Sequence, residues 1–340
     1  MDKNVKRIKW GIIGCGGIAA KRTIPGMLLG RNAICQAVMD INEQVVREVQ
    51  NKFHIPDAYT SLEALLKSDI DAVYIATPVF CHREQVMKAA EAGKHILLEK
   101  PMGLSCKEGE EMSAFCYDKK VKLGIGFMMR FHGAHQKIKK LIKDGLIGEV
   151  VSAYAKFNCW YPEGKQVWRQ NKVLAGGGAM MDMGIHRIDL LQYVTGLRAE
   201  SIVALCGNQI FSYAHVEDAA SAVLKMNNGA LFSIESNFNI PGSVGCKLEI
   251  YGTHGCVIAD GTMGQTESGS VRFLSTDCVK SEYSFLDYES GNMYTKEVEA
   301  FSDAIINNTR VPFTAEEAIF DQRIVEAIYE SQELEKHIHL

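Results

Sequence analysis

The sequence predicts an α/β protein with two domains, a doubly wound parallel sheet followed by an α+β domain with a large, mostly antiparallel open sheet. In the first part, short apolar runs alternate with helical patterns as far as about residue 127, which is typical of a parallel sheet. In the second part, strand-like runs separated by turn signals fill residues 200–275. A chain of 340 residues is long enough for both. We therefore expect domains at 1–127 and 128–340, with the last helix able to pack back on the first domain.

Composition excludes several classes of protein. Hydrophobic residues make up 47% and charged residues 23%, and the net charge of −4 is spread over both signs, unlike the concentrated basic patch of a nucleic-acid-binding surface. No apolar run approaches the ~18 residues of a membrane span, and the basic start leads straight into a strand without the pattern of a signal peptide. The ten cysteines form no Cys-x-x-Cys pair, so we interpret them as reduced, mostly buried thiols of a cytoplasmic protein.

The elements of the first domain follow one another in a regular order. Strands are expected at 7–13, 34–39, 71–76, 95–98 and 121–127, and helices after 19, at 42–53, 82–93 and 105–119. Thr60-Ser-Leu-Glu63 has the pattern of a capping box and predicts a short helix. Gly93 suits the position that ends a helix.

A glycine motif joins the first strand to the first helix. Gly14-Cys-Gly16-Gly-Ile-Ala19 fits Gly-x-Gly-x-x-Ala, in which the first glycine permits a tight turn and the second lets the backbone approach a pyrophosphate. The small third residue allows the helix to pack on the strand, and the helix N-terminus favours an anion. The motif predicts a dinucleotide site because a strand precedes it and a helix follows it.

Asp40 ends the second strand, 24 residues after Gly16, near the separation expected of a ribose-binding acid. Such a carboxylate accepts hydrogen bonds from ribose hydroxyls and repels a 2′-phosphate. Ile41 and Asn42 provide no arginine for a phosphate, so NAD is favoured over NADP. The alternative is an acid that only faces solvent at a strand end.

Two further segments, Thr77-Pro78 and Glu99-Lys100-Pro101, also follow strands of the first domain. Ligands of doubly wound sheets bind at the carboxyl ends of the strands. The glycine motif, Asp40 and these two segments should therefore line one edge of the sheet.

The second domain begins after about residue 130. Helices are expected at 132–144, 181–195, 294–307 and about 314–335, and strands at 149–158, 200–209, 217–227, 230–238, 246–252, 255–260 and 270–275. Asn228-Gly229 suits a two-residue hairpin loop. A loop with Trp160, Tyr161, Trp168 and Arg169 precedes the 181–195 helix.

The run from Gly176 to Asp189 carries the residues that we expect to perform the chemistry. Three glycines lead into a helix that is apolar on most of its surface, and Asp182 and His186 stand four residues apart on one face. A carboxylate one turn from an imidazole can orient it as a general base. The alternative is a helix whose polar residues only cap or pair locally.

His132-x-x-His135 raises the question of a metal site, but a third ligand is not evident in the sequence. A helix start with a capping histidine is the preferred interpretation. His337-x-His339 lies in the C-terminal tail and receives no role. No metal is expected.

The combination of the glycine motif, Ala76-Thr-Pro78, Glu99-Lys-Pro101 and Gly176-Gly-Gly…Asp182-x-x-x-His186 resembles the Gfo/Idh/MocA oxidoreductases, over nearly the whole chain. The resemblance implies a Rossmann domain, a nicotinamide cofactor, a sugar or cyclitol substrate, and a homodimer or homotetramer built on the open sheet. Apolar residues at successive positions of Ser221–Leu224 and Ala230–Ile234 also indicate a sheet covered on both faces.

The resemblance also implies residue roles. Lys100 would stabilise the alkoxide charge, His186 would act as general base, and Asp182 would hold substrate hydroxyls or orient His186. The cofactor would contact Gly14, Gly16, Gly17, Ile18, Asp40, Thr77, Pro78, His82, Glu99 and Lys100. The substrate would contact Arg130, Trp168, Arg169, Asp182 and His186, although an exposed loop pair is an equal interpretation of Trp168-Arg169.

Three functions remain open from the sequence. The first is an NAD(P)-dependent dehydrogenase or reductase of a polyhydroxylated substrate. The second is an enzyme that uses held NAD to cleave glycosidic bonds by oxidation and elimination. The third is a non-catalytic NAD-sensing regulator, against which the intact Lys100, Asp182 and His186 argue.

Overall fold

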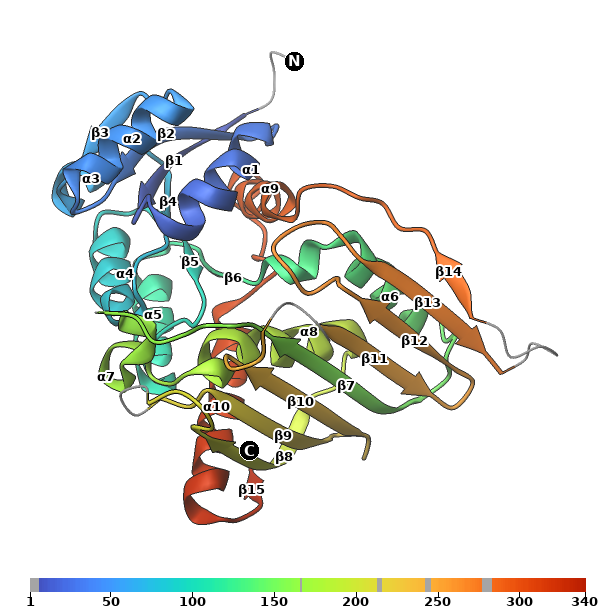
Figure 1. Cartoon of the computed structure of the whole chain (residues 1–340). Coiled ribbons are helices and arrows are strands. Elements are labelled where there is room, and N and C mark those ends of the chain that lie inside the picture. Colours follow the sequence, from blue (N-terminus) through green and yellow to red (C-terminus); the bar gives the residue numbers. More distant parts are fainter. Residues whose placement is uncertain (1–5, 166, 213–215, 242–245, 277–282) are drawn as a thin grey trace. The chain divides into compact units, whose positions relative to one another are not determined.

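The structure is a computed structural model that describes residues 6–165, 167–212, 216–241, 246–276 and 283–340. The chain divides into two compact units (Figure 1). The first comprises residues 1–128 and 292–319, and the second comprises 129–291 and 320–340. The expected boundary after residue 127 lies one residue from this division, but segment 292–319, which we placed in the second domain, belongs to the first unit.

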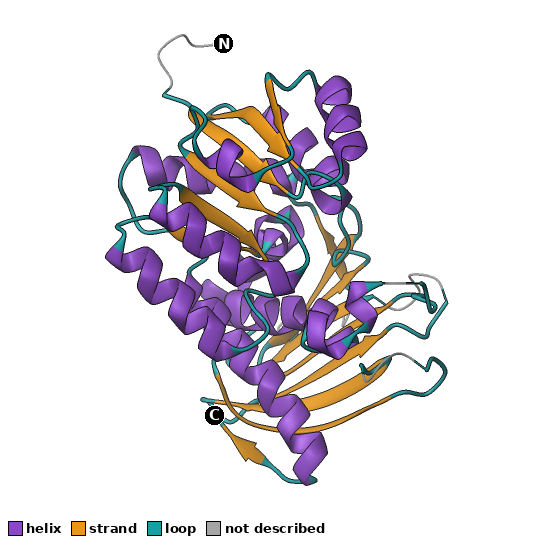
Figure 2. Cartoon of the chain, turned by 90° about the vertical axis from the view of Figure 1, so that its left-hand side faces the viewer, coloured by secondary structure: helices purple, strands orange, loops and turns teal. Residues whose placement is uncertain are grey.

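The first unit contains a six-stranded parallel sheet in the order β3-β2-β1-β4-β5-β6. Its strands are β1 (Ile8–Ile13), β2 (Ala33–Met39), β3 (Asp57–Tyr59), β4 (Ala72–Ile75), β5 (His95–Glu99) and β6 (Leu123–Gly126). Helices lie on both sides of the sheet (Figure 2). The doubly wound parallel sheet is confirmed. The sequence did not predict β3, because this edge strand has three half-buried residues and no apolar run.

The helices of the first unit are η1 (Ala19–Thr23, a π-helix), α1 (Ile24–Leu29), α2 (Glu43–Phe53), α3 (Leu62–Leu66), η2 (Val79–Cys81), α4 (His82–Glu91) and α5 (Cys106–Asp118). Side chains cap the starts of some of them, such as α2, α3 and α5. Asn42 caps α2 by accepting from the N–H groups of Gln44 and Val45. The cap of α3 is Ser61 and not Thr60, because the Ser61 hydroxyl accepts from Ala64 N at 3.3 Å.

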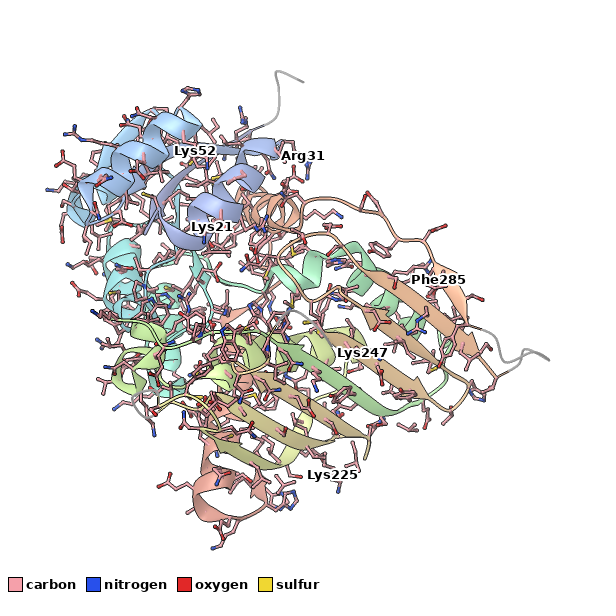
Figure 3. All side chains as sticks on the ribbon, viewed as in Figure 1. Lys21, Arg31, Lys52, Lys225, Lys247 and Phe285 are labelled. Carbon is pink, nitrogen blue, oxygen red and sulfur yellow. The ribbon has the colours of Figure 1, made fainter. Side chains whose placement is uncertain are left out.

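Helix α9 (Met293–Ile306) returns to the first unit from far along the chain. It approaches α1 closely at Gly26, where a Cβ would lie 2.9 Å from Tyr294 Cβ and 3.0 Å from Thr295 N. Arg31, labelled in Figure 3, pairs with Asp303 of α9 at 2.5 Å. The sequence predicted the helix but contained no signal for its partner.

The second unit contains a nine-stranded sheet in the order β14-β13-β12-β11-β7-β10-β9-β8-β15. The strands are β7 (Val150–Asn158), β8 (Ala199–Gly207), β9 (Ala219–Met226), β10 (Leu231–Asn237), β11 (Lys247–Gly252), β12 (Gly255–Asp260), β13 (Ser270–Ser275), β14 (Ser284–Leu286) and β15 (Ile338–His339). All neighbours run antiparallel except β10 and β7. The expected antiparallel sheet is confirmed, with two short edge strands, β14 and β15, that the sequence did not predict.

The remaining helical segments are η3 (Met128–Phe131), α6 (Gly133–Lys143), η4 (Trp168–Gln170), α7 (Lys172–Ala175), η5 (Met180–Gly184, a π-helix), α8 (Ile185–Thr195) and α10 (Ala315–Leu334). His132 caps α6, since its Nδ1 accepts from Ala134 N at 3.1 Å, as the sequence predicted. Among the described residues, no group of three His, Cys, Asp or Glu side chains could hold a metal ion.

The loop between β9 and β10 differs from the prediction. Met226 N donates to Ala230 O at 2.9 Å and Gly229 N donates to Met226 O at 2.8 Å, so the loop has three residues and not two. Gly229 has a φ of +88°, the conformation required where a type I turn is followed by a bulge.

Within the single chain, burial alternates along β9, so the chain itself covers one face of the sheet there. Cover of the other face by a second subunit stays a prediction. The outward face nevertheless carries exposed apolar side chains, among them Val203, Leu205, Val223 and Leu231. Phe285 of β14, labelled in Figure 3, is also largely exposed.

Among the described residues, no helix combines the length and apolar character needed to cross a membrane. Their nine cysteines are all free thiols, and the tenth, Cys278, lies outside the described residues.

Candidate functional site

The glycine motif of the first unit forms a cradle at the end of β1. Gly14 has a φ of +80°, and a Cβ on it would lie 2.8 Å from Thr77 Cγ2. A Cβ on Gly16 would lie 3.9 Å from Asp40 Oδ2, whereas one on Gly17 would meet nothing within 4 Å. The backbone is therefore open at Gly17, where a helical turn begins, and the expected ribose-binding carboxylate lies beside Gly16. This arrangement fits a dinucleotide with its pyrophosphate at the helix start.

The helix after this cradle is not a regular α-helix. Residues Ala19–Thr23 are π-helical, and α1 follows directly. Ile18 lies at the start of the π-helix and Ala19 is fully buried, as the small third position of the motif requires.

The His82 side chain lies between the two loops that end β4 and β5. It is buried, with Nε2 3.0 Å from Thr77 O and Nδ1 3.1 Å from Pro101 O. Burial lowers the pKa of His82 to about 4, which keeps the ring neutral at physiological pH. The sequence placed His82 among the cofactor contacts, but this placement favours a role in holding Thr77-Pro78 against Glu99-Lys100-Pro101.

Glu99 is connected to the core of the first unit by a tyrosine that the sequence did not single out. The Tyr74 hydroxyl donates to Glu99 Oε1 and accepts from Thr23 Oγ1 at 3.0 Å. Burial, with the Glu99 charge adding to it, raises the pKa of Tyr74 well above its usual value. Glu99 is thus fixed at the end of β5, next to Lys100.

In the second unit, Asp182 and His186 lie on the first two turns of one continuous helix. Asp182 belongs to the π-helical turn η5 and His186 to the first turn of α8. The expected α-helix therefore begins with a wider turn, in which residues four apart still lie about one turn from each other. Asp182 is half-buried, and His186 is 7% exposed.

The aromatic loop brings Arg169 to Asp182. Arg169 Nε lies 3.6 Å from Asp182 Oδ1, and its guanidinium carbon lies 4.3 Å from the centre of the Trp168 ring. Tyr161 is beside the same guanidinium, and burial raises its pKa while Arg169 opposes that rise. An aromatic face thus stands next to a cation and a carboxylate, a combination suited to the C–H face and hydroxyls of a sugar.

Arg130 has a different place from the one expected. Its guanidinium is buried, with Nε 2.9 and 3.0 Å from the two carboxylate oxygens of Asp189, and it lies over the Tyr193 ring at 4.9 Å. A guanidinium committed to a buried carboxylate in this way holds helices together. This pairing favours a structural role for Arg130, and its expected contact with the substrate stays a prediction.

Sequence patterns did not single out three residues near this helix, namely Arg187, Glu217 and Tyr329. Arg187, next to His186, is buried over the Phe157 ring at 4.1 Å, and burial lowers its pKa to about 10. Glu217 and Tyr329 contact the glycines that precede the helix. The only sequence signal for Glu217 was a pair of acids, Glu217-Asp218, directly before an apolar strand.

Comparisons with known proteins give matches for both parts of the chain. The family "Oxidoreductase family, NAD-binding Rossmann fold" matches residues 8–127, and the family "GFO/IDH/MocA C-terminal domain" matches residues 135–258. The chain is 30% identical to a D-xylose 1-dehydrogenase (NADP(+)) of Haloferax volcanii, over 95% of this chain and 97% of the relative. It is 32% identical to a 2,7-anhydro-N-acetylneuraminate hydratase of Escherichia coli, over 78% of this chain and 70% of the relative.

A solved structure has the same fold. The aldose-aldose oxidoreductase of Caulobacter crescentus superposes with a TM-score of 0.91 at 24% identity, covering 98% of this chain and all of the other. Sequence motifs, both family matches and the fold lead to one conclusion: the chain belongs to the Gfo/Idh/MocA family of NAD(P)-binding oxidoreductases.

Proposed function

We propose that the chain is an NAD-dependent dehydrogenase that oxidises one hydroxyl of a sugar, sugar derivative or cyclitol. The substrate class rests on the contacts of Arg169 with Asp182 and with the Trp168 ring. Asp182 lies on the helix that also bears His186. The names of relatives that act on sugars support the same class. The choice of NAD rests on Asp40 beside Gly16.

The residues have distinct parts in the proposed reaction. His186 takes the proton of the reacting hydroxyl, and the Lys100 ammonium stabilises the negative charge that develops on its oxygen. Asp182 accepts a hydrogen bond from a substrate hydroxyl, and Trp168 packs on the C–H face of the ring. The nicotinamide, when bound, accepts the hydride. Gly14, Gly16, Gly17 and Asp40 would hold the dinucleotide.

The experiment is a panel of sugars and cyclitols offered with NAD and with NADP, followed by the absorbance of the reduced nicotinamide. With the substrate so found, His186→Ala should lower kcat by about 10²–10⁴-fold, because a positioned base is lost. NAD affinity should stay nearly unchanged, since His186 is not among the residues of the glycine cradle. His337→Ala, in the C-terminal tail, is the matched control and should behave as the wild type.

Lys100→Ala should also lower kcat, and the double variant should lose less than the product of the two losses, because both groups act on one proton transfer. If His186→Ala retains near-full activity, the assignment of the base is wrong.

A second candidate is oxidation followed by elimination, with the cofactor regenerated in each cycle. A relative named as a hydratase of an anhydro sugar acid favours it. Product release without accumulation of NADH would select this reaction over net oxidation.

We also propose that the chain forms a homodimer or homotetramer through the exposed face of the nine-stranded sheet. The support is the apolar side chains of Val203, Leu205, Val223 and Leu231 on that face.

A further inference from the structure

The helix that bears Asp182 and His186 begins without a cap from its own sequence. Ala179, which precedes the first helical residue, has no side-chain hydrogen bond to the helix start. The first N–H groups of a helix have no partner inside it, and a buried start needs acceptors from elsewhere.

Glu217 supplies these acceptors from a position 39 residues away in the sequence. Its Oε2 accepts from Gly178 N at 2.9 Å and its Oε1 accepts from Met180 N at 2.8 Å. Its own backbone carbonyl accepts from Ala179 N at 3.2 Å. One residue therefore binds three successive N–H groups at the point where the chain enters the helix.

The glycines of this segment are needed for that approach. A Cβ on Gly178 would lie 2.0 Å from Glu217 O, and a Cβ on Gly177 would lie 2.1 Å from Tyr329 Oη. Both distances are far inside van der Waals contact. The glycine run thus lets the strand segment and α10 come close enough to hold the helix start.

Tyr329 connects Glu217 to α10. Its hydroxyl donates to Glu217 Oε1 at 2.9 Å, so the carboxylate accepts three donors while it is 8% exposed. Burial raises the pKa of Glu217, and the N–H groups of Met180 and Gly178 oppose that rise. A carboxylate in this place also interacts favourably with the helix dipole.

We infer that Glu217 is a positioning residue that fixes the first turn of the helix and thereby the places of Asp182 and His186. Asp182 follows Met180 by two residues, and Asp182 N donates to Gly178 O at 2.9 Å. A shift of the glycine backbone would therefore move the Asp182 carboxylate as well. The catalytic part of this inference rests on the proposed function. Misplacement of about 1 Å can cost 10²-fold in rate.

The test is Glu217→Gln, which keeps the shape of the side chain but replaces one carboxylate oxygen with an amide NH₂. That NH₂ group cannot accept, so the N–H group of Gly178 or of Met180 loses its acceptor. Hydrogen exchange followed by mass spectrometry should become faster in residues 176–186, and this readout requires no substrate. With the substrate that the sugar panel identifies, kcat should fall at least tenfold, while KM changes less and the Kd of NADH stays within twofold.

Ser331→Ala is the matched control. Ser331 lies two residues from Tyr329 on α10, is 1% exposed, and accepts from Ala204 N at 3.0 Å, so its loss removes a buried hydrogen bond elsewhere in the same unit. It should lower the melting temperature while leaving kcat and the exchange of residues 176–186 unchanged. Tyr329→Phe removes one donor to Glu217, should cause a smaller change in the same direction, and carries the test if Glu217→Gln does not fold.

The inference is overturned if exchange in residues 176–186 is unaltered in both variants, or if their kcat stays within twofold of the wild type while His186→Ala is inactive. A fully active His186→Ala would instead refute the proposed base, and the exchange rates would still decide whether Glu217 holds the helix start.

Discussion

The Asp40 carboxylate lies beside Gly16, and we propose that it meets the ribose of the dinucleotide at its 2′-position. A second contact orients this side chain, because Oδ1 accepts from Asn42 N at 3.1 Å. The carboxylate is therefore held in place before any cofactor binds, which reduces the entropy lost on binding.

From this geometry we expect NAD to be the better cofactor. Asp40→Ser should narrow the preference for NAD over NADP, because the carboxylate that repels the 2′-phosphate of NADP is removed. The measurement is kcat/KM with NAD and NADP for both proteins. A relative named for NADP(+) makes the comparison informative. Equal or better efficiency of the unmutated protein with NADP would contradict the role of Asp40.

Most helices and strands could be predicted because their apolar patterns are local. The buried runs of β1, β2 and β4 stand between turn signals, and the 181–195 helix is apolar on nearly every side. The π-helical turns could not be predicted, since one extra residue in a turn leaves no separate period in the sequence.

Contacts between distant elements were outside the reach of the sequence. No pattern near Gly178 predicts its contact with Glu217, and no pattern in α9 predicts its contact with Gly26. The pairing of Arg130 with Asp189, 59 residues later, is likewise visible only in three dimensions.

Helices α8 and α10 are joined by a pair of buried carboxyls. Asp189 and Asp321 are 1% and 2% exposed, with Arg130 donating to Asp189 and Gln192 donating to Asp321 at 2.7 Å. Burial, followed by the Asp189 charge, raises the pKa of Asp321 well above its usual value. Folded Asp321 therefore holds its proton to higher pH than an unfolded aspartic acid does.

This pair predicts a pH dependence of stability. Above about pH 4 an unfolded Asp321 releases its proton whereas the folded one retains it, so the folded state binds more protons. The free energy of unfolding should then fall as pH rises towards the folded pKa, by at most about 1.4 kcal/mol per pH unit.

Asp321→Asn should remove this slope, because an amide does not titrate. Melting temperatures from about pH 5 upwards, just above the unfolded pKa, would measure it, with the exposed Asp118→Asn as control. Parallel curves for the wild type and Asp321→Asn would contradict the prediction.

At the scale of the whole molecule, the chain itself covers the β8 edge of the nine-stranded sheet, while one face of β8–β10 carries exposed side chains. Along β8, Ser331 Oγ accepts from Ala204 N at 3.0 Å, Gln332 Oε1 accepts from Cys206 N at 2.7 Å, and β15 pairs with the remainder. The strand edge is thus satisfied by the chain itself. We therefore expect self-association through the exposed face of the sheet, where β8–β10 and the end of α10 enclose a groove of about 670 Å³.

We expect a dimer or tetramer by light scattering at micromolar concentration, and the double variant Leu205→Glu/Val223→Lys should dissociate it, because charges would have to be buried in the interface. Tyr117→Lys is the control, since Tyr117 is 83% exposed on α5 of the first unit. A monomeric wild type, or a double variant of unchanged mass, would rule out this interface.

The division of the chain also governs when it can fold during synthesis. The first unit needs residues 292–319, and the second needs 320–340, which include the Tyr329 that holds Glu217. Domains usually fold in order as the ribosome releases them, the N-terminal one first. Here the first unit is complete only once residue 319 has been made and the second only at residue 340, so a nascent chain stalled before residue 292 would carry two unfinished cores.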